Sequence, residues 1–395
     1  MNKQFLRNIA DIQTGPFGSQ LHKEDYVDIG TPIVTVEHLG NRTFTEQNLP
    51  KVSAEDKARL SKYVLAEGDI VFSRVGSVDR CSYVDTVHDG WMFSGRCLRV
   101  RPNSEIDSLF LYYFFCLEET KQFVRNIAVG ATMPSINTKL LGEVEIDLPS
   151  MEDQRKIAAT LSSLDDKIET NQKINDNLEQ QAQSYFQELF VDNADPEWTT
   201  GTISDLGAVV GGSTPSKAKP EYYTESGIAW ITPKDLSINK SKFVSHGEND
   251  ITELGLKNSS AAIMPEGTVL FSSRAPIGYI AIAAGEVTTN QGFKSVVPKP
   301  EIGTPFVYFF LKNTLPVIEG MASGSTFKEV SGSTMKNVPA VIPDAETLAK
   351  FSDFCTPIFA QQCILEGQNQ LLATLRDNLL PKLMSGEIDV SKLDI

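Results

Sequence analysis

Two glycine-rich loops combine residue types that suit contact with phosphate oxygens and base edges. Residues 14–19 read Thr-Gly-Pro-Phe-Gly-Ser, and residues 211–217 read Gly-Gly-Ser-Thr-Pro-Ser-Lys. Glycine lets a backbone approach a ligand closely, and hydroxyl and lysine side chains bind phosphate oxygens. The candidate contacts in these loops are Thr14, Gly15, Phe17, Ser19, Ser213, Thr214 and Lys217.

An arginine follows a small polar residue in a second pair of loops, as Ser73-Arg74 and as Ser273-Arg274. Arginine at a strand end suits phosphate contact or bidentate recognition of guanine, and the amides of Asn290 and Gln291 suit adenine edges. For any single loop, a turn that carries a surface side chain is the simpler interpretation. The repetition of the loops at matching places favours a ligand instead. Further candidates in or near such loops are Arg80, Arg96, Thr132, Lys234, Thr326 and Lys328.

The loops recur because the sequence contains one module twice. Residues 9–12 (Ile-Ala-Asp-Ile) recur as 203–206 (Ile-Ser-Asp-Leu), 194 residues later. Residues 67–73 recur as 266–272, 199 residues later, and Gly-Ala-Thr at 130–132 recurs as Gly-Ser-Thr at 324–326. A period near half of the chain is too long for a solenoid. It predicts two whole modules with approximate two-fold symmetry, and such molecules bind two-fold ligands or two copies of a partner.

Sequence motifs for catalysis are missing. There is no Pro-Pro dipeptide, so the turn with which amino-methyltransferases hold a target base is absent, and no Gly-Lys dipeptide marks a P-loop. The four histidines lie at no metal-ligand spacing from a cysteine. Asp165 and Asp166 are adjacent on an expected helix, so their side chains diverge, and we expect a solvated face rather than an acid pair. The pattern favours a binding protein.

The composition is that of a soluble globular chain with room for two or three domains. The 395 residues are 41% hydrophobic and 22% charged, and no apolar run approaches the roughly 18 residues that span a membrane. The five cysteines form no paired motif, which predicts reduced thiols in the cytoplasm. A net charge of −15 argues against nucleic acid, but the basic residues near the loops allow local binding if a partner supplies most phosphate contacts.

Each module mixes strands with one buried helix, which predicts an α+β fold. Alternating or β-rich segments are bounded by Gly, Asp or Pro, as strands are. Strands are expected in residues 32–36, 69–72, 91–100 and 143–148 of the first module and in 228–231, 269–271 and 279–282 of the second. Buried helices are expected in residues 109–124 and 306–311.

A long helix is expected after each module. Residues 150–191 contain no Gly or Pro, and Ser150 with Asp153 is a plausible helix start. Apolar residues recur every seven positions there, and Asn171 and Asn175 interrupt this seam, which costs stability but fixes register. A second helix is expected over 345–383, where Pro357 should kink or restart it.

The two helices most simply pack on each other, antiparallel, as a coiled-coil spacer between the modules. The other interpretation is that they are ordinary core helices. The seam residues expected to serve as spacer and to bind partners are Ile157, Leu161, Leu164, Ile168, Leu178, Leu365, Leu372 and Leu379.

Several of these segments resemble one family, the specificity subunits of Type I restriction–modification systems. Residues 211–216 with 228–236 resemble the opening of its target-recognition domain, and 267–279 with 289–293 resemble its middle motif. Residues 148–158 with 164–168 resemble its central helix, and 379–388 resemble its C-terminal ending. The first module lacks the Gly-Gly-Ser-Thr-Pro loop, and the distal helix lacks the Glu-Asp-Gln-Arg-Lys pattern, so the halves are equivalent only approximately.

The resemblance implies target-recognition domains over 1–149 and 193–343, a central helix over 150–192, and a distal helix with tail over 344–395. Each domain would read half of a split site in double-stranded DNA, and the helices would set the gap. Two modification subunits, which bind S-adenosylmethionine and methylate adenine, would dock on the chain, and restriction subunits would use ATP and Mg to translocate and cut DNA. The chain itself would bind no cofactor and no membrane and would be non-catalytic.

Two other classes of protein stay open at the level of the residues. One is a single-chain restriction or methylation enzyme whose chemistry the motifs do not reveal. The other is a coiled-coil adaptor whose two modules bind protein or sugar rather than DNA.

Overall fold

The computed structural model describes residues 2–324 and 328–390, which form two compact units. Unit 1 comprises residues 1–168 and 371–395, and unit 2 comprises residues 169–370. The boundary between them falls within two long helices, α6 (Met151–Gln187) and α12 (Ala345–Met384), so each unit holds part of both helices. The segment boundaries expected from the sequence stay a prediction.

Unit 1 alternates short strands with short helices before α6 begins. Its elements are β1 (Asn2–Phe5), α1 (Leu6–Ile9), β2 (Ala10–Thr14), β3 (Tyr26–Val27), β4 (Thr31–Val34), β5 (Lys51–Val52), α2 (Ala54–Arg59), β6 (Ile70–Ser73), β7 (Cys81–Tyr83), β8 (Met92–Phe93), β9 (Cys97–Pro102), α3 (Ser108–Cys116), α4 (Glu118–Ile127), α5 (Thr138–Leu141) and β10 (Glu145–Leu148).

Among the described residues, unit 2 follows a similar order, with one more strand and the same number of short helices. Its elements are β11 (Thr199–Thr202), α7 (Ile203–Leu206), β12 (Gly207–Gly211), β13 (Tyr223–Thr224), β14 (Ile228–Ile231), α8 (Pro233–Ile238), β15 (Phe243–Val244), β16 (Asn249–Ile251), α9 (Glu253–Lys257), β17 (Val269–Ser273), β18 (Ile277–Ala283), β19 (Thr288–Thr289), β20 (Lys294–Pro298), α10 (Thr304–Met321), α11 (Gly332–Lys336) and β21 (Pro339–Ile342).

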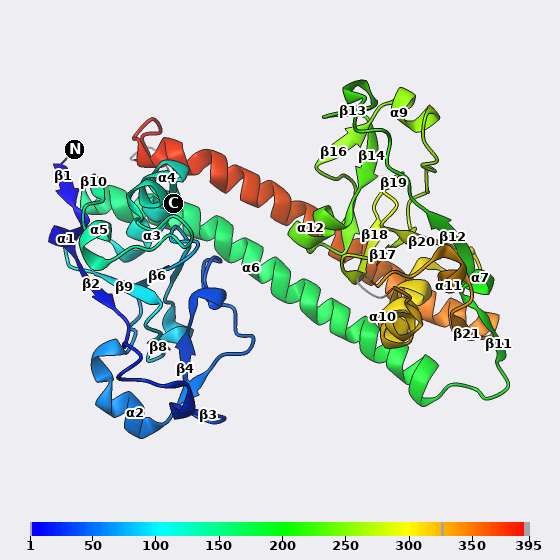
Figure 1. Ribbon diagram of the computed structural model, residues 1–395, viewed down its shortest axis with the longest axis horizontal. Coiled ribbons are helices and arrows are strands. Elements are labelled where there is room, and N and C mark those ends of the chain that lie inside the picture. The colour runs from blue at the N-terminus through cyan, green and yellow to red at the C-terminus, as the bar shows by residue number, and fades with distance from the viewer. Residues whose placement is uncertain (1, 325–327, 391–395) are drawn as a thin grey trace. The chain divides into compact units, whose positions relative to one another are not determined.

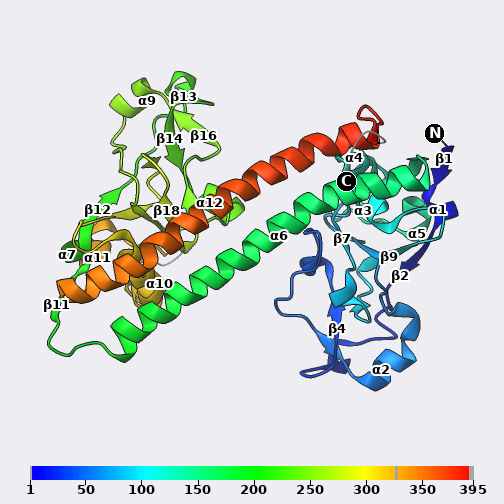
Figure 2. The ribbon, with the colours of Figure 1, turned by 180° about the vertical axis from the view of Figure 1, so that it is seen from behind.

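The two units share one strand topology. The order β2-β9-β6-β7 in unit 1 matches β12-β20-β17-β18 in unit 2, where β15 extends the edge. A second sheet, β3-β5-β4-β8 or β13-β16-β14-β19, and an antiparallel pair, β1-β10 or β11-β21, complete each unit. In unit 1, α2 and β4 lie away from α3 and the start of α6 in both views (Figure 1, Figure 2). The expected α+β class with two like modules is confirmed.

Backbone hydrogen bonds show which residues of the two copies correspond. The Leu6 N–H donates to the Val144 carbonyl and the Ile203 N–H donates to the Val338 carbonyl, so Leu6 and Ile203 open equivalent helical turns. The repeat in the sequence paired Ile203 with Ile9, and this pairing is wrong by one helical turn. Ile203 begins α7, whereas Ile9 ends α1. The pairing of residues 67–73 with 266–272 is correct, since β6 begins at Ile70 and β17 at Val269.

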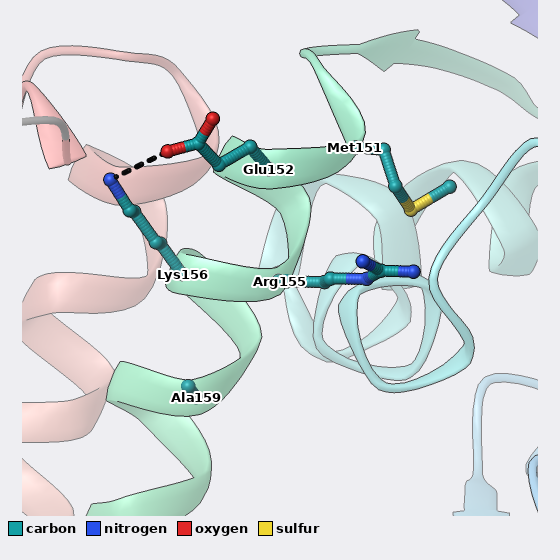
Figure 3. Close-up of a pocket in the computed structure, with 5 residues that line it drawn as sticks. All are labelled: Met151, Glu152, Arg155, Lys156 and Ala159. Carbon is teal, nitrogen blue, oxygen red and sulfur yellow. Dashed lines mark ion pairs between the residues drawn. The ribbon is translucent and has the colours of Figure 1, made fainter.

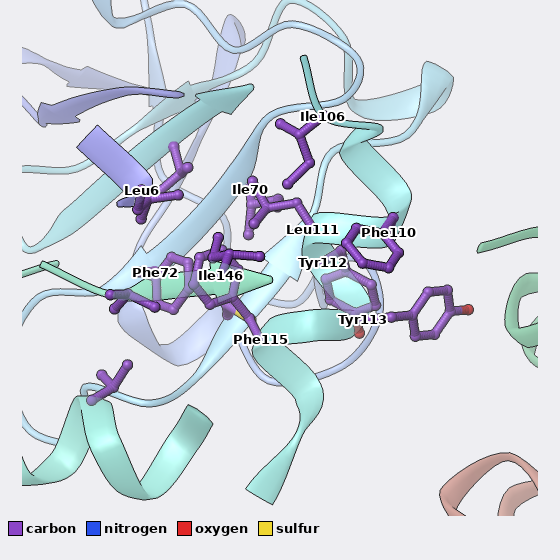
Figure 4. Close-up of a cluster of buried hydrophobic side chains, with 14 of the residues drawn as sticks. Leu6, Ile70, Phe72, Ile106, Phe110, Leu111, Tyr112, Tyr113, Phe115 and Ile146 are labelled. Atoms are coloured by element: carbon purple, nitrogen blue, oxygen red, sulfur yellow. The ribbon is translucent and has the colours of Figure 1, made fainter. Parts of the chain in front are cut away.

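Aromatic and aliphatic side chains of α3 form the centre of the unit 1 core (Figure 4). Phe72 packs edge-on against Phe115 at 4.6 Å between ring centroids. Burying each such side chain contributes about 1.5–3 kcal/mol. The single buried helix expected over 109–124 is wrong, because Leu117 adopts an extended conformation and separates α3 from α4. The second helix opens with two glutamates and buries only one face.

The two long helices, α6 and α12, cover most of the residues in which the sequence predicted them. The Ser150 hydroxyl accepts a hydrogen bond from the Asp153 N–H at 3.1 Å, which confirms the expected helix start. Helix α6 ends at Gln187 and a π-helical turn, Glu188–Asp192, follows. Helix α12 continues through Pro357, so the expected restart is wrong. Ile358 and Phe359 are buried beside the proline, and this packing offsets its missing N–H.

The helices run antiparallel within each unit. In unit 2, Asn171 is fully buried and its Nδ2 donates to Oδ1 of Asn369 at 2.8 Å, while the Gln362 amide donates to the Asn175 carbonyl at 3.1 Å. A buried asparagine in an apolar seam penalises other registers, because a shift removes the half-buried Asn369 that accepts from it. The expected role of Asn171 is therefore supported by a specific partner.

Asp165 lies in the interior of unit 1, not on a solvated face as expected. Its carboxylate accepts from the Tyr113 hydroxyl at 2.6 Å and pairs with Arg376 of α12 at 2.6 Å. Asp166, the next residue, points outward, and Arg42 pairs with it. The two side chains diverge as expected, but the buried one connects α3 and both long helices. A charge pattern alone could not show that a tyrosine and an arginine lie opposite.

Lys242 performs the corresponding role in unit 2. Its side chain is 7% exposed, and its ammonium contacts Glu179 of α6 at 2.8 Å and Gln362 of α12 at 2.9 Å. The Phe359 ring centroid is 3.4 Å away and that of Tyr308 is 4.4 Å away. Burial lowers the pKa of Lys242 to about 8, against the opposing effect of the Glu179 carboxylate. Lys242, directly before β15, thus links this strand to both long helices through buried polar contacts.

We expect Lys242→Met to lower the free energy of unfolding by about 1.5–3 kcal/mol, because Gln362 and one oxygen of Glu179 lose a buried charged donor, while Lys312 still pairs with Glu179 at 2.6 Å. Denaturant unfolding of the full chain measures the change. Lys234→Met, which removes the exposed lysine of a Lys–Glu pair in the same unit, is the matched control and should change little. Equal effects of the two substitutions would contradict the anchoring role of Lys242.

Candidate nucleic-acid interface

In unit 1 the loop after β2 packs against the loop before β9 without space for side chains. A Cβ added to Gly15 would lie 2.1 Å from the Ser94 carbonyl oxygen, and one added to Gly95 would lie 2.2 Å from the Pro16 carbonyl oxygen. Beyond this contact Phe17 is 56% exposed. The glycines in the loop therefore serve a close approach of two backbone segments, and Phe17 is presented to solvent at their edge.

Arg74 lies at the same edge of unit 1. Its guanidinium donates to the Gly95 carbonyl at 3.0 Å and lies 5.9 Å from the Phe17 ring centroid. The neighbouring Gly76 N–H donates to the Pro134 carbonyl, in the loop that carries Thr132. The structure thus brings together three loops that the sequence singled out.

The other predicted contacts of unit 1 divide into exposed and buried residues. Ser73 is 1% exposed and its hydroxyl donates to the Val75 carbonyl at 2.8 Å, so its prediction as a DNA contact is wrong: it stabilises the loop from inside. Arg80 packs over Gly40, whose added Cβ would lie 2.7 Å from its Nε. The exposed residues that remain candidates are Ser19, Arg80, Arg96 and Thr132, and Thr14 is half-buried.

In unit 2 the loop after β12 is held by the loop after β19. A Cβ on Gly212 would lie 1.9 Å from the Asn290 carbonyl oxygen. The Ser213 N–H donates to the Thr289 carbonyl, and the Ser213 carbonyl accepts from the Trp230 indole at 3.0 Å. The Thr214 hydroxyl donates to Oε1 of Gln291. The 211–217 loop is therefore a fixed surface feature, and Lys217 is exposed upon it.

The side-chain amide oxygens of Asn290 and Gln291 already accept hydrogen bonds from groups within these loops. Oδ1 of Asn290 accepts from the Gly292 N–H at 2.8 Å, and Oε1 of Gln291 accepts from Thr214. Bidentate recognition of adenine uses the amide oxygen as acceptor and the nitrogen as donor. The expected pairing with adenine edges therefore competes with these loop contacts, and the amide nitrogens are the groups better placed for a ligand.

Two residues of this surface were missed by the sequence reasoning. Glu329 contacts Arg274 at 3.3 Å and Lys294 at 3.8 Å. Burial lowers the pKa of Lys294, and Glu329 opposes that shift. Neither residue stands in a repeated motif, so no signal in the sequence joined them to Arg274. Their proximity depends on a contact across 55 residues of chain.

The remaining predicted contacts of unit 2 lie in different environments. Ser273 is fully buried and its hydroxyl donates to the Gly292 carbonyl at 3.1 Å, so its prediction as a DNA contact is also wrong. Lys234 pairs with Glu248 at 2.6 Å, which raises the lysine pKa. Lys328 is exposed. Thr326 lies outside the described residues.

The two arginines do not occupy equivalent backbone positions. The Arg74 carbonyl accepts from the Ile136 N–H, and in the other copy the Ser273 carbonyl accepts from the Val330 N–H. Arg74 thus corresponds to Ser273, and Arg274 corresponds to Val75. The Ser-Arg dipeptides match in letters but are displaced by one residue in the fold, so the two surfaces present their arginines differently.

The predicted partner-binding residues of the long helices are mostly inside the units. Ile157, Leu161 and Leu365 are buried, which agrees with their expected place in the helical seam but leaves them no surface for a partner. The partly buried residues Leu164, Ile168, Leu178, Leu372 and Leu379 follow the same seam.

Other residues of the helices are more open to a partner. Leu371 is 74% exposed on α12. At the start of α6, Met151, Arg155 and Ala159 border a hollow of about 510 Å³, and Lys156 pairs with Glu152 at 3.1 Å beside it (Figure 3). No group of three or more metal-ligating side chains occurs among the described residues. Over the same residues, no helix has the length and apolarity to cross a membrane.

Two modules of one topology, each with arginine, hydroxyl and exposed basic groups on its loops, have the residue types that a DNA-recognition protein needs. The family model for the Type I restriction modification DNA specificity domain matches residues 1–180 and 196–383. The chain therefore belongs to this family, the specificity subunits of Type I restriction–modification systems, and the resemblance is confirmed.

Individual relatives agree over different lengths. The chain is 41% identical over 169 residues to the Type I restriction enzyme MjaIX specificity subunit of Methanocaldococcus jannaschii, which is 42% of this chain and 39% of that protein. It is 24% identical to the HindI specificity subunit of Haemophilus influenzae, over 85% of this chain and 90% of that protein. The crystal structure of the S subunit from M. genitalium has the same fold, with a TM-score of 0.62 at 18% identity over 97% of this chain and 95% of that one.

Gly212→Ala should displace the 211–217 loop, because its Cβ would meet the Asn290 carbonyl at 1.9 Å. We expect a destabilisation of about 1–3 kcal/mol and faster tryptic cleavage after Lys217. Gly285→Ala is the control, since nothing lies within 4 Å of its added Cβ. Unchanged cleavage in Gly212→Ala would show that the loop is not held by this contact.

Proposed function

We propose that this chain is the non-catalytic DNA-recognition subunit of a Type I restriction–modification complex, and that each unit reads one half of a split DNA site. The observation that supports the proposal most strongly is the recurrence of one topology with polar loops at the ends of equivalent strands. Each set of loops presents an arginine, hydroxyl groups and exposed basic residues. These groups suit phosphate and base contacts in the major groove.

The charge of the chain requires partners on the DNA. A net charge of −15 gives little affinity for phosphate by itself. Two modification subunits that carry the S-adenosylmethionine site and methylate adenine would supply most phosphate contacts, with restriction subunits adding ATP- and Mg-dependent cleavage. The hollow at Met151 and Arg155 and the exposed Leu371 are the candidate docking positions for such subunits. The complex would work in the cytoplasm, where bacteria and archaea keep their DNA.

Methylome sequencing of a host that expresses the chain with its modification subunit tests the proposal. We expect methylated adenines in one split motif with a fixed gap. The purified chain, mixed with DNA and S-adenosylmethionine, should transfer no methyl group, because the methyltransferase belongs to the partner. Methylation by the chain alone, or a continuous motif, would contradict the proposal.

The helices are proposed to set the gap between the half-sites. Since Asn171 of α6 pairs with Asn369 of α12, a heptad must be removed from both helices to keep their register. A matched deletion should shorten the pair by about 10 Å and the preferred gap by roughly three base pairs, at 1.5 Å per helical residue and 3.4 Å per base pair. The half-sites should stay the same, and methylome sequencing reads both.

Deletion of seven residues from α6 alone is the control. It should lower stability rather than give a new gap, because the asparagine pair and the domain anchors fall out of register. An unchanged gap after the matched deletion would show that the helices are not the ruler.

A further inference from the structure

An acidic residue stands among the cations of the unit 2 reading surface. Glu329 contacts Arg274 at 3.3 Å through Oε2 and Lys294 at 3.8 Å through Oε1, and its side chain is 38% exposed. A carboxylate near DNA phosphates opposes binding, because it repels the backbone and neutralises cations that would release counterions. Its presence there calls for a role other than affinity.

The backbone fixes the place from which this carboxylate projects. The Glu329 N–H donates to the Ser323 carbonyl at 2.9 Å and the Ser323 N–H donates back at 3.1 Å. The next residue, Val330, donates to the Ser273 carbonyl at 3.0 Å, directly before Arg274. Both side chains therefore leave backbone that is hydrogen-bonded together, so their contact is a property of the fold and not of two mobile surface chains.

Glu329 also connects the loops that face the proposed ligand. Lys294, which it holds, donates to the Gln291 carbonyl at 3.2 Å, and Gln291 in turn accepts from Thr214. One chain of contacts thus runs from the 211–217 loop through Gln291, Lys294 and the Glu329 carboxylate to Arg274. Arg274 has other N–H groups in addition to the one that Glu329 holds, since a guanidinium carries five.

The fold does not require this acid. In unit 1 the equivalent hairpin position is Ser135, which pairs with Val129 as Glu329 pairs with Ser323. The Ser135 hydroxyl donates to the Val129 carbonyl at 3.2 Å. The equivalent of Lys294 is Leu98, since each pairs with the last residue of the first strand in its sheet. The Arg–Glu–Lys cluster is therefore particular to one reading surface.

We propose that Glu329 is a specificity-determining positioning residue, which holds one edge of the Arg274 guanidinium so that its free N–H groups meet a guanine edge in the unit 2 half-site. The inference rests on the proposed function. Restraint by the carboxylate keeps Arg274 from swinging to the nearest phosphate, where it would bind every sequence alike. Glu329 thus lowers the affinity for all DNA sequences and raises the discrimination between bases.

Glu329→Gln tests the inference in the complex of the full chain with its modification subunit. Using duplexes that carry the site found by methylome sequencing, we expect discrimination at one base pair of one half-site to fall by roughly 5- to 150-fold, the range for losing a bidentate contact. Binding to unrelated duplexes should strengthen, because a negative charge is removed. Arg274→Ala should lose the same discrimination but weaken unrelated binding.

Glu221→Gln, which breaks the exposed pair with Lys219 in the same unit, is the matched control and should leave discrimination unchanged. The double variant Glu329→Gln/Arg274→Ala should discriminate no worse than Arg274→Ala alone, since the acid acts through the arginine. Additive losses would overturn the inference, as would full discrimination in Glu329→Gln. Recognition of the other half-site reports that each variant folds and assembles.

The two levels of proposal fail in different ways. If the wild-type complex methylates no split site, the proposed function fails. If it methylates a split site that Glu329→Gln still recognises with full discrimination, only the role of Glu329 fails.

Discussion

The pairing of buried charges where each module meets the long helices is the constraint on which the rest of the structure depends. In unit 1 Asp165 lies between Tyr113 and Arg376, and in unit 2 Lys242 lies between Glu179 and Gln362. An unpaired buried charge costs several kcal/mol, so a module that slid along either helix would lose its partner. The loops of each unit are thereby fixed with respect to the helical segments that it contains.

On this shared scaffold the two reading surfaces use different chemistry. Arg74 is held by a backbone carbonyl and lies near an aromatic ring, whereas Arg274 is held by a carboxylate. The arginines also leave the backbone one position apart. A duplicated fold can therefore present two unlike surfaces. Close backbone contacts at glycine positions hold the loops in place, while the exposed side chains differ between the two copies. This separation suits a protein whose halves read unrelated bases.

Sequence patterns correctly predicted features that depend on interactions between neighbouring residues. The β14 strand at 228–231 and the start of α6 at Ser150 follow from β-branched composition and from a capping pattern within four residues. Sequence patterns failed for residues whose contacts lie far away in the chain. Ser73 and Ser273 have the composition of contact residues, yet both are buried against loop carbonyls. Leu117 has an extended backbone and divides the expected helix into α3, which is buried on most sides, and α4, which buries one face.

The sequence by itself determined the duplication, the α+β class, the two long helices and the family, because each is written in residue types at fixed spacing. The tertiary structure alone decided which candidates reach the surface and which partners they have. It buried Asp165, displaced the two arginines from equivalence and brought Glu329 beside Arg274. These are contacts between segments far apart in the chain, and their energies depend on burial and geometry that spacing along a sequence does not specify.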